Sequence, residues 1–231
     1  MSTALAAGPP SRARIMVCDP SAVACPRRIV TEFARRAFRR PVADAEIDPY
    51  LKLIDRAKAG GDTFERGLQL ALQAVLVAPD FLFRVELDPA PGIEHDLDPY
   101  ELASRLSFFI WSSIPDDTLL ALAASGELSN PETLAAQVRR LLADPKAAAI
   151  SNVLTEQWLE LVVLDSASPE GARFPTFDSA LRTAMRREPE LLFGTVLRGE
   201  APLTDLLTPT YTFANQRLAE HYGLPEAASL G

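Results

Sequence analysis

The sequence predicts an all-α protein. Apolar residues recur at the three- and four-residue spacing of amphipathic helices, and Pro, Gly, Asp and Asn separate these segments where helices begin and end. No segment alternates apolar and polar residues for long enough to predict a sheet, and no internal repeat is found. We therefore expect a small three-helix N-terminal bundle followed by a larger multi-helix domain around a central apolar helix.

Residues 1–25 are predicted to be a disordered lead and the remnant of an upstream domain, with residues 15–17 as the last trace of a strand. A small helical domain is expected at 26–88. A D-x-x-E capping signal at Asp62 marks the start of its third helix, and the Pro-rich sequence at 88–92 predicts a linker. The three helices are expected at 27–40, 44–59 and 62–78.

The most apolar helical segment is 101–117, ELASRLSFFIWSSIPDD, near the start of the larger domain expected at 96–225. Asp98 can cap this helix, Pro99 suits its first turn, and Glu101 can accept a hydrogen bond from a free backbone N–H. Apolar residues interrupted by few polar ones predict a central helix that is covered on several sides. One stripe of it contains Leu102, Leu106 and Phe109.

The larger domain continues with four more helical signals after a restart at Pro115. Pro189 lies inside the longest of them, where it removes one backbone hydrogen bond and is expected to kink the helix. The restarted helix is expected to end near Gly126, and the others are expected at 131–142, 146–161, 178–198 and 212–222.

The charge of the chain is unevenly distributed. Its 231 residues have a formal net charge of −8. Residues 1–60 carry 11 Lys and Arg against 6 Asp and Glu, whereas the remainder carries 12 against 25. The basic run lacks interleaved aromatic residues and a reading helix, so we expect no nucleic-acid binding. No apolar run is long enough to predict a membrane span. The basic run consists of Arg27, Arg28, Arg35, Arg36, Arg39 and Arg40.

Cys18 and Cys25 are the only cysteines. Their spacing fits neither a C-x-x-C-H haem attachment nor a C-x-x-C redox pair. A metal site of Cys and His is disfavoured because His95 and His221 lie far away in the sequence. Two interpretations stay open, namely a disulfide in an oxidising compartment and two inert thiols.

The adjacent Asp116 and Asp117 could form a paired-carboxylate site. Because they follow Pro115, they fit the first turn of a helix better, where the helix dipole favours negative charge. Arg105 lies among apolar neighbours, and a buried guanidinium requires a carboxylate partner. We therefore expect a structural ion pair between Arg105 and Asp116 or Asp117.

The segment EHDLD at 94–98 offers one imidazole and three carboxylates that could bind a cation. A solvated loop and a helix cap explain it better. No G-x-S-x-G, P-loop or zinc motif is present. The residues alone therefore predict no catalytic residue, no cofactor-binding residue and no metal ligand.

Five strings of this sequence resemble two helical domains of unknown function that occur in tandem in exported multidomain proteins of planctomycete and acidobacterial type. CPRRIVTEFARRAFRRPVADAEI and FERGLQLALQAVLVAPDFLFRVE resemble the smaller domain. The larger domain is matched by YELASRLSFFIWSSIPDDTLLALAASGEL, LLADPKAAAISNVLTEQWLEL and YTFANQRLAEHYGLP.

The resemblance implies an extracytoplasmic protein, often fused to a planctomycete-type cytochrome c, and it favours a disulfide between Cys18 and Cys25. It implies no activity, and a c-type haem is expected only in a fused or partner domain. This chain has no signal peptide and no C-x-x-C-H segment, so we expect a fragment of a longer protein. The expected function is a non-catalytic scaffold or docking module that binds domains of the same polypeptide or a c-type cytochrome. The alternative is an extracytoplasmic hydrolase or oxidoreductase acting on polysaccharide.

Overall fold

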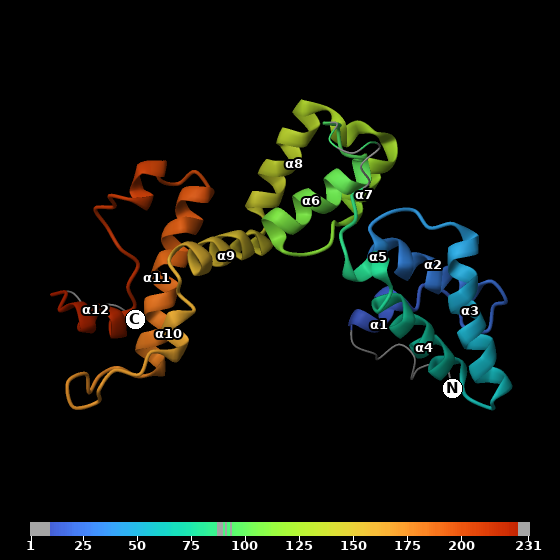
Figure 1. The fold of residues 1–231 in the computed structure, drawn as a ribbon, viewed down its shortest axis with the longest axis horizontal. Helices are drawn as coiled ribbons and strands as arrows, with labels where there is room; N and C mark the ends of the chain where they lie inside the picture. The colour runs from blue at the N-terminus through green and yellow to red at the C-terminus, as the bar shows by residue number, and fades with distance from the viewer. Residues whose placement is uncertain (1–9, 87–89, 91, 93, 226–231) are drawn as a thin grey trace. The chain divides into compact units, whose positions relative to one another are not determined.

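The computed structural model describes residues 10–86, 90, 92 and 94–225, and in these ranges the chain is helical with no strand (Figure 1). The predicted all-α class is confirmed. None of the helices in this part of the chain is long and apolar enough to cross a membrane. The α-helices are α1 Pro10–Ile15, α2 Cys25–Phe38, α3 Asp44–Ala59, α4 Phe64–Leu76, α5 Pro79–Leu82, α6 Pro99–Trp111, α7 Asp117–Ser125, α8 Pro131–Ala143, α9 Ala148–Trp158, α10 Val163–Ser166, α11 Ser179–Leu197 and α12 Gln216–Tyr222.

The chain divides into two compact units. Unit 1 comprises residues 1–108 and 113–134, and unit 2 comprises residues 109–112 and 135–231. Most of the linker expected at 88–92 lies outside the described residues. The sequence domains expected at 26–88 and 96–225 stay a prediction.

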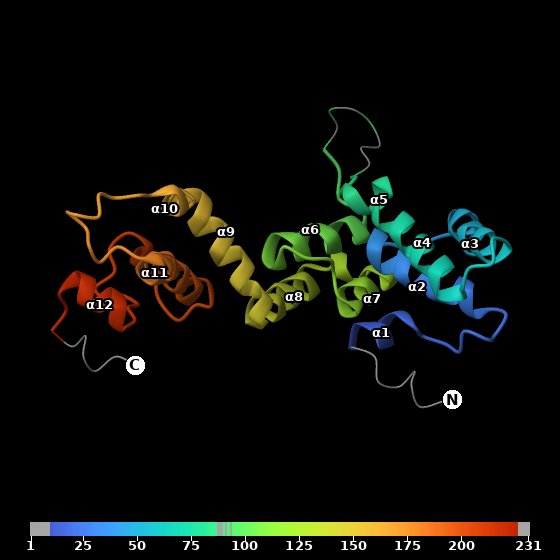
Figure 2. The ribbon, with the colours of Figure 1, turned by 90° about the horizontal axis from the view of Figure 1, so that it is seen from below.

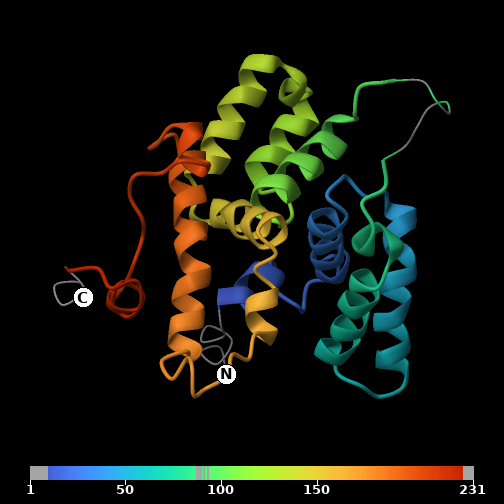
Figure 3. The same cartoon turned by 60° about the vertical axis from the view of Figure 1, so that its left-hand side comes forward.

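Unit 1 has a hydrophobic core that α2, α3 and α4 share, and α5 follows α4 beside α2 (Figures 1 and 2). Ile29, Ile47 and Val75 are among its fully buried side chains. The helices α3 and α4 run side by side (Figure 3) and approach closely at Gly67. A Cβ atom at this position would lie 3.0 Å from the Cα atom of Ile54, so any larger residue would have to push the backbone of α3 away by a few tenths of an ångström.

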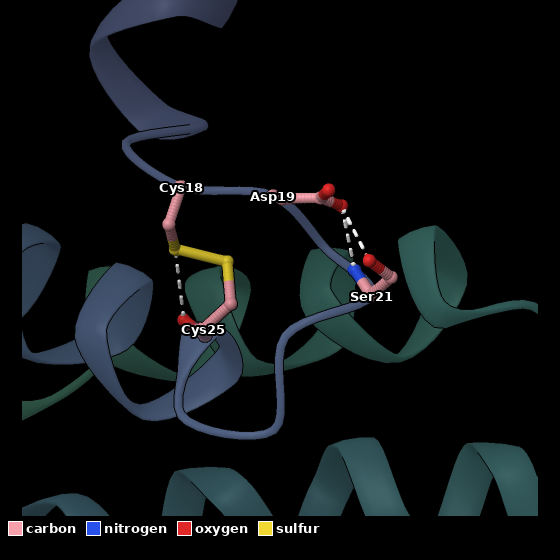
Figure 4. Close-up of a disulfide and its surroundings, with 4 residues drawn as sticks. All are labelled: Cys18, Asp19, Ser21 and Cys25. Carbon is pink, nitrogen blue, oxygen red and sulfur yellow. Dashed lines mark hydrogen bonds between the residues drawn. A yellow bond between two sulfur atoms is a disulfide. The ribbon is translucent and has the colours of Figure 1, made fainter.

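The expected strand at residues 15–17 is absent, because Ile15 ends α1 and the next residues form no ladder. Their apolar side chains pack instead against the core of unit 1. A disulfide between Cys18 and Cys25 fixes this segment at the start of α2, with the two Cα atoms 5.7 Å apart (Figure 4). The disulfide interpretation is therefore confirmed, and the inert-thiol interpretation is wrong.

The start of α6 agrees with the sequence in atomic detail. The Asp98 carboxylate accepts a hydrogen bond from the Tyr100 N–H at 2.8 Å, and Glu101 accepts one from the Asp98 N–H at 3.0 Å. The helix ends at Trp111, before Ser112 with its left-handed φ of 50°. The predicted coverage on several sides is wrong for one position, because Phe109 is 66% exposed. Helical spacing identifies apolar stripes but does not show how many of them are covered.

The helix α4 begins with a different cap from the predicted one. The start of α4 is capped by Thr63, whose side chain accepts a hydrogen bond from the Arg66 N–H at 3.2 Å, and not by the predicted Asp62.

The helix α11 begins at the Asp178 cap and continues as one element through Pro189. A single missing hydrogen bond inside a helix of 19 residues is therefore tolerated.

Unit 2 is built around α11, which contacts α9, α10 and α12 (Figure 3). Leu181 of α11 and Leu218 of α12 are fully buried and belong to the same hydrophobic cluster. At the other end of this unit, Trp111 is buried and donates its indole N–H to the Leu141 carbonyl at 2.9 Å. The Lys146 ammonium lies 4.4 Å from the centre of the Trp111 ring, a cation–π contact.

Replacing both cysteines, Cys18→Ala with Cys25→Ala, should lower the free energy of unfolding of unit 1 by about 2 kcal/mol, because the unfolded chain loses a short covalent loop. Hydrogen exchange of the α2 amides in increasing urea measures this unit alone. Val23→Ala changes an exposed residue of the same loop and is the matched control. A double variant as stable as the control would show that the disulfide contributes nothing.

Candidate functional site

Unit 1 contains a groove of about 840 Å³. Its walls are the end of α2 at residues 38–41, the segment around α5 at 79–86, and the first turns of α6 with the residues before them. Arginine and carboxylate side chains alternate with apolar ones along these walls. Its volume lies within the range of small-molecule sites.

Arg39 is the most buried charged residue of the groove, with 5% of its surface exposed. It is the C-cap of α2 and has a left-handed φ of 61°, which turns its side chain toward α5. Its Nη2 donates to the carbonyls of Asp80 at 2.7 Å and Phe83 at 2.9 Å. Its Nη1 donates to the Ala37 and Phe81 carbonyls at 2.9 and 3.3 Å.

Four main-chain carbonyls thus satisfy a buried guanidinium in place of a carboxylate. Burial lowers the pKa of Arg39, and the positive charge of Arg84 lowers it further, while Asp80 acts in the opposite direction. Arginine stays protonated in proteins because the guanidinium is a very strong base. The result is a fixed positive charge that holds α5 against the end of α2.

The next residue, Arg40, forms a bridge between three elements. It donates to Glu46 of α3 at 2.7 Å and to Asp80 of α5 at 2.8 Å. The hydrogen bond from Arg40 lowers the pKa of Glu46, and a second one from the Ala43 N–H lowers it further. Because both acids are partly exposed, these pairs contribute more to orientation than to stability.

The ion pair predicted for Arg105 must be corrected. Arg105 is exposed and donates from Nε to Glu86 at 3.0 Å, and its Nη2 donates to the same carboxylate. This hydrogen bond lowers the pKa of Glu86, and the charges of Arg84 and His95 add to the effect. The expectation was wrong because Arg105 lies on an open face of α6 and needs no buried partner.

Asp116 and Asp117, the expected partners of Arg105, have separate roles. The Asp116 carboxylate caps α7 by accepting a hydrogen bond from the Leu119 N–H at 2.9 Å. Asp117 accepts one from Arg35 of α2 at 3.1 Å. The interpretation of both residues as a helix start is confirmed, because Asp116 caps α7 and Asp117 is its first residue. Asp117 also joins α7 to α2 within unit 1.

The basic run of α2 is largely engaged within unit 1. Arg27 pairs with Asp44 at 3.1 Å, and Arg36 donates to the Arg14 carbonyl at 2.8 Å. The exposed Arg28 forms no such bond within the part of the chain that the structure describes. Most of this run therefore fastens α2 to its neighbours.

The segment 94–98 contributes to one wall of the groove. Its Asp98 is the cap of α6, as expected. Within the described ranges, no three His, Cys, Asp or Glu side chains are arranged to hold a metal ion.

The groove brings together residues that the sequence did not connect. Arg39, Glu86 and Ser104 came from different parts of the chain, and neither a motif nor a spacing connects them. The one sequence signal for this part of the groove was the pair Arg39-Arg40 before Pro41. It places two cations where a helix must end. Positively charged side chains near the last turn of a helix often bind carbonyl groups.

Two family models match this sequence. One, described as "Protein of unknown function (DUF1592)", matches residues 97–224, more than half of the chain. The other, described as "Protein of unknown function (DUF1595)", matches residues 25–86. No curated protein and no solved structure matches the chain. The resemblance to two tandem domains of unknown function is thus confirmed.

Arg39→Gln should lower the free energy of unfolding of unit 1 by about 3 kcal/mol, because several carbonyls lose a charged donor in a buried place. Amide hydrogen exchange of α2, α4 and α5 provides the measurement. Arg28→Gln, an exposed change on the same helix, is the control and should shift stability by less than about 0.5 kcal/mol. Equal values for the two variants would contradict the role assigned to Arg39.

The stability of unit 1 should decrease in acid, and Arg40 should be one cause. The folded pKa of Glu46 lies below its ordinary value near 4.5, so its contribution is present above that value and is lost as the pH falls through the lowered one. Arg40→Gln removes the main cause of the shift. The variant should therefore lose less stability than the parent between about pH 5 and pH 3. Parallel acid profiles in urea unfolding would refute this.

Proposed function

We propose that this chain, which belongs to the family described as "Protein of unknown function (DUF1592)", is a helical, non-catalytic scaffold or docking module. In this proposal it is part of an exported, cytochrome-associated multidomain protein of planctomycete or acidobacterial type. Its partners are other domains of the same polypeptide or a c-type cytochrome.

The observation that carries the scaffold role is the way in which the groove uses its charges. Arg39 binds main-chain carbonyls, Arg40 binds carboxylates of α3 and α5, and Arg105 binds Glu86. Each of these side chains joins two or three segments of unit 1. Charged groups that are engaged in holding the fold together favour a rigid scaffold over a catalytic site that transfers protons.

The compartment is supported by the disulfide. Disulfides form and persist in oxidising environments such as the periplasm and the extracellular space, and they are rare in the cytosol. A bond between Cys18 and Cys25 in a chain with these two cysteines alone is compatible with export. The proposed location is therefore an oxidising compartment outside the cytoplasm.

The negative charge of the chain supports a basic partner. With 12 basic against 25 acidic residues after position 60, the larger part of the chain has a negative field. Complementary charge accelerates association and favours partners of opposite sign. A basic c-type cytochrome has the required sign.

Titration with a basic c-type cytochrome by calorimetry should detect binding at about 10 mM salt and a dissociation constant at least tenfold larger at about 200 mM salt, because salt screens exposed charges. The same cytochrome with succinylated lysines is the control and should not bind. Undetectable binding at low salt would count against the docking role, and equal binding of the succinylated protein would exclude charge as its basis.

A further inference from the structure

We infer that the groove of unit 1 binds a small organic carboxylate, whose charged group is held by Arg84 and whose apolar skeleton contacts the neighbouring groove residues. This site is additional to the scaffold role and does not depend on it. Arg84, Ser104, Phe83 and Val85 line the groove at this site. The ring of Phe108 lies against the Arg84 guanidinium.

Arg84 carries unused hydrogen-bond donors. Its guanidinium carbon lies 4.8 Å from the centre of the Phe108 ring. Stacking on an aromatic face fixes a guanidinium while its in-plane N–H groups stay available. Among the described residues, none accepts a hydrogen bond from Arg84, and its side chain is exposed at the groove. A planar fork of five donors is thus held in place without an acceptor.

A second positive charge lies at the same ring. The guanidinium carbon of Arg39 is 5.8 Å from the centre of Phe108, and its hydrogen bonds go to carbonyls. The pKa of Arg39 is lowered by burial first and by the charge of Arg84 second, so the two cations repel each other. The nearby Glu86 is already bonded to Arg105. An anion beside Arg84 would relieve this repulsion.

Ser104 supplies a further polar group to this site. It lies four residues before Phe108 on α6, which puts both residues on one face of the helix. Ser104 is 8% exposed, and its Oγ has no hydrogen-bond partner in the described part of the chain. Buried hydroxyl groups are normally hydrogen-bonded, so an additional acceptor or donor is expected here. After a rotation about χ1, an oxygen of the ligand could fill that role.

The surroundings favour a carboxylate over a phosphate. The two oxygens of a carboxylate match the fork of a guanidinium. Phe83 and Val85 are largely exposed at the groove and offer apolar contact to an organic skeleton. Asp96 and Asp98 also line the groove, and their negative charges penalise a dianion more than a monoanion.

The test uses the complete ¹⁵N-labelled chain and four probes with different skeletons, namely acetate, benzoate, octanoate and glucuronate. At least one should bind with saturation below about 10 mM and shift the Arg84 Nε signal together with amides at the start of α6. Benzamide, octanamide and inorganic phosphate should bind at least tenfold more weakly than that probe. Failure of all four carboxylates to saturate, or tighter binding of phosphate, would overturn the inference.

Variants assign the residues. Arg84→Gln should weaken the best probe at least tenfold, because the charged fork is lost. Arg28→Gln removes another exposed arginine of unit 1, outside the groove, and should leave the dissociation constant unchanged. Ser104→Ala should weaken binding twofold to fivefold, an order-of-magnitude expectation for one neutral hydrogen bond. Unchanged binding in Arg84→Gln would refute the site, and equal losses in Arg84→Gln and Arg28→Gln would reduce it to general charge attraction.

Discussion

The arrangement of unit 1 depends on a buried positive charge that is satisfied by main-chain carbonyls. Arg39 has 5% of its surface exposed, and a charge in such a place is tolerated only where hydrogen bonds replace its hydration. Its acceptors lie at the end of α2 and along α5, so these elements must keep their positions as long as the guanidinium stays buried. One wall of the groove is thereby fixed.

The helix α2 is therefore held at both of its ends by different chemistry. Cys25, its first residue, is bonded to Cys18, which brings the preceding segment onto the core. Arg39, immediately after its last residue, binds α5. Between these points, Arg27 and Arg35 pair with exposed acids, and such pairs set orientation while contributing little stability. A rigid helix with arginines on its surface is suited to support neighbouring segments and partners.

Local features were predicted well from the sequence, and long-range partners were not. The capping box of Asp98 and Glu101 and the helix start at Asp116 could be predicted because each involves residues within one turn. The pair of Arg105 with Glu86 could not, since residues 19 positions apart meet only after folding. Arg39 stood out only as part of a pair of cations before Pro41. Its acceptors could not be predicted, because carbonyl groups exist at every residue. Residues 15–17 have β-forming side chains, yet packing on the core decides their conformation.

Hydrogen bonds to the backbone of α5 should immobilise the Arg39 guanidinium. Side-chain ¹⁵N NMR of the complete chain tests this directly, because such bonds hinder rotation of the guanidinium and slow the exchange of its protons with water. Arg39 should give separate, slowly exchanging Nη protons, whereas the exposed Arg28 should give a single averaged, rapidly exchanging signal. Averaged Nη protons for Arg39 that exchange as fast as those of Arg28 would contradict it.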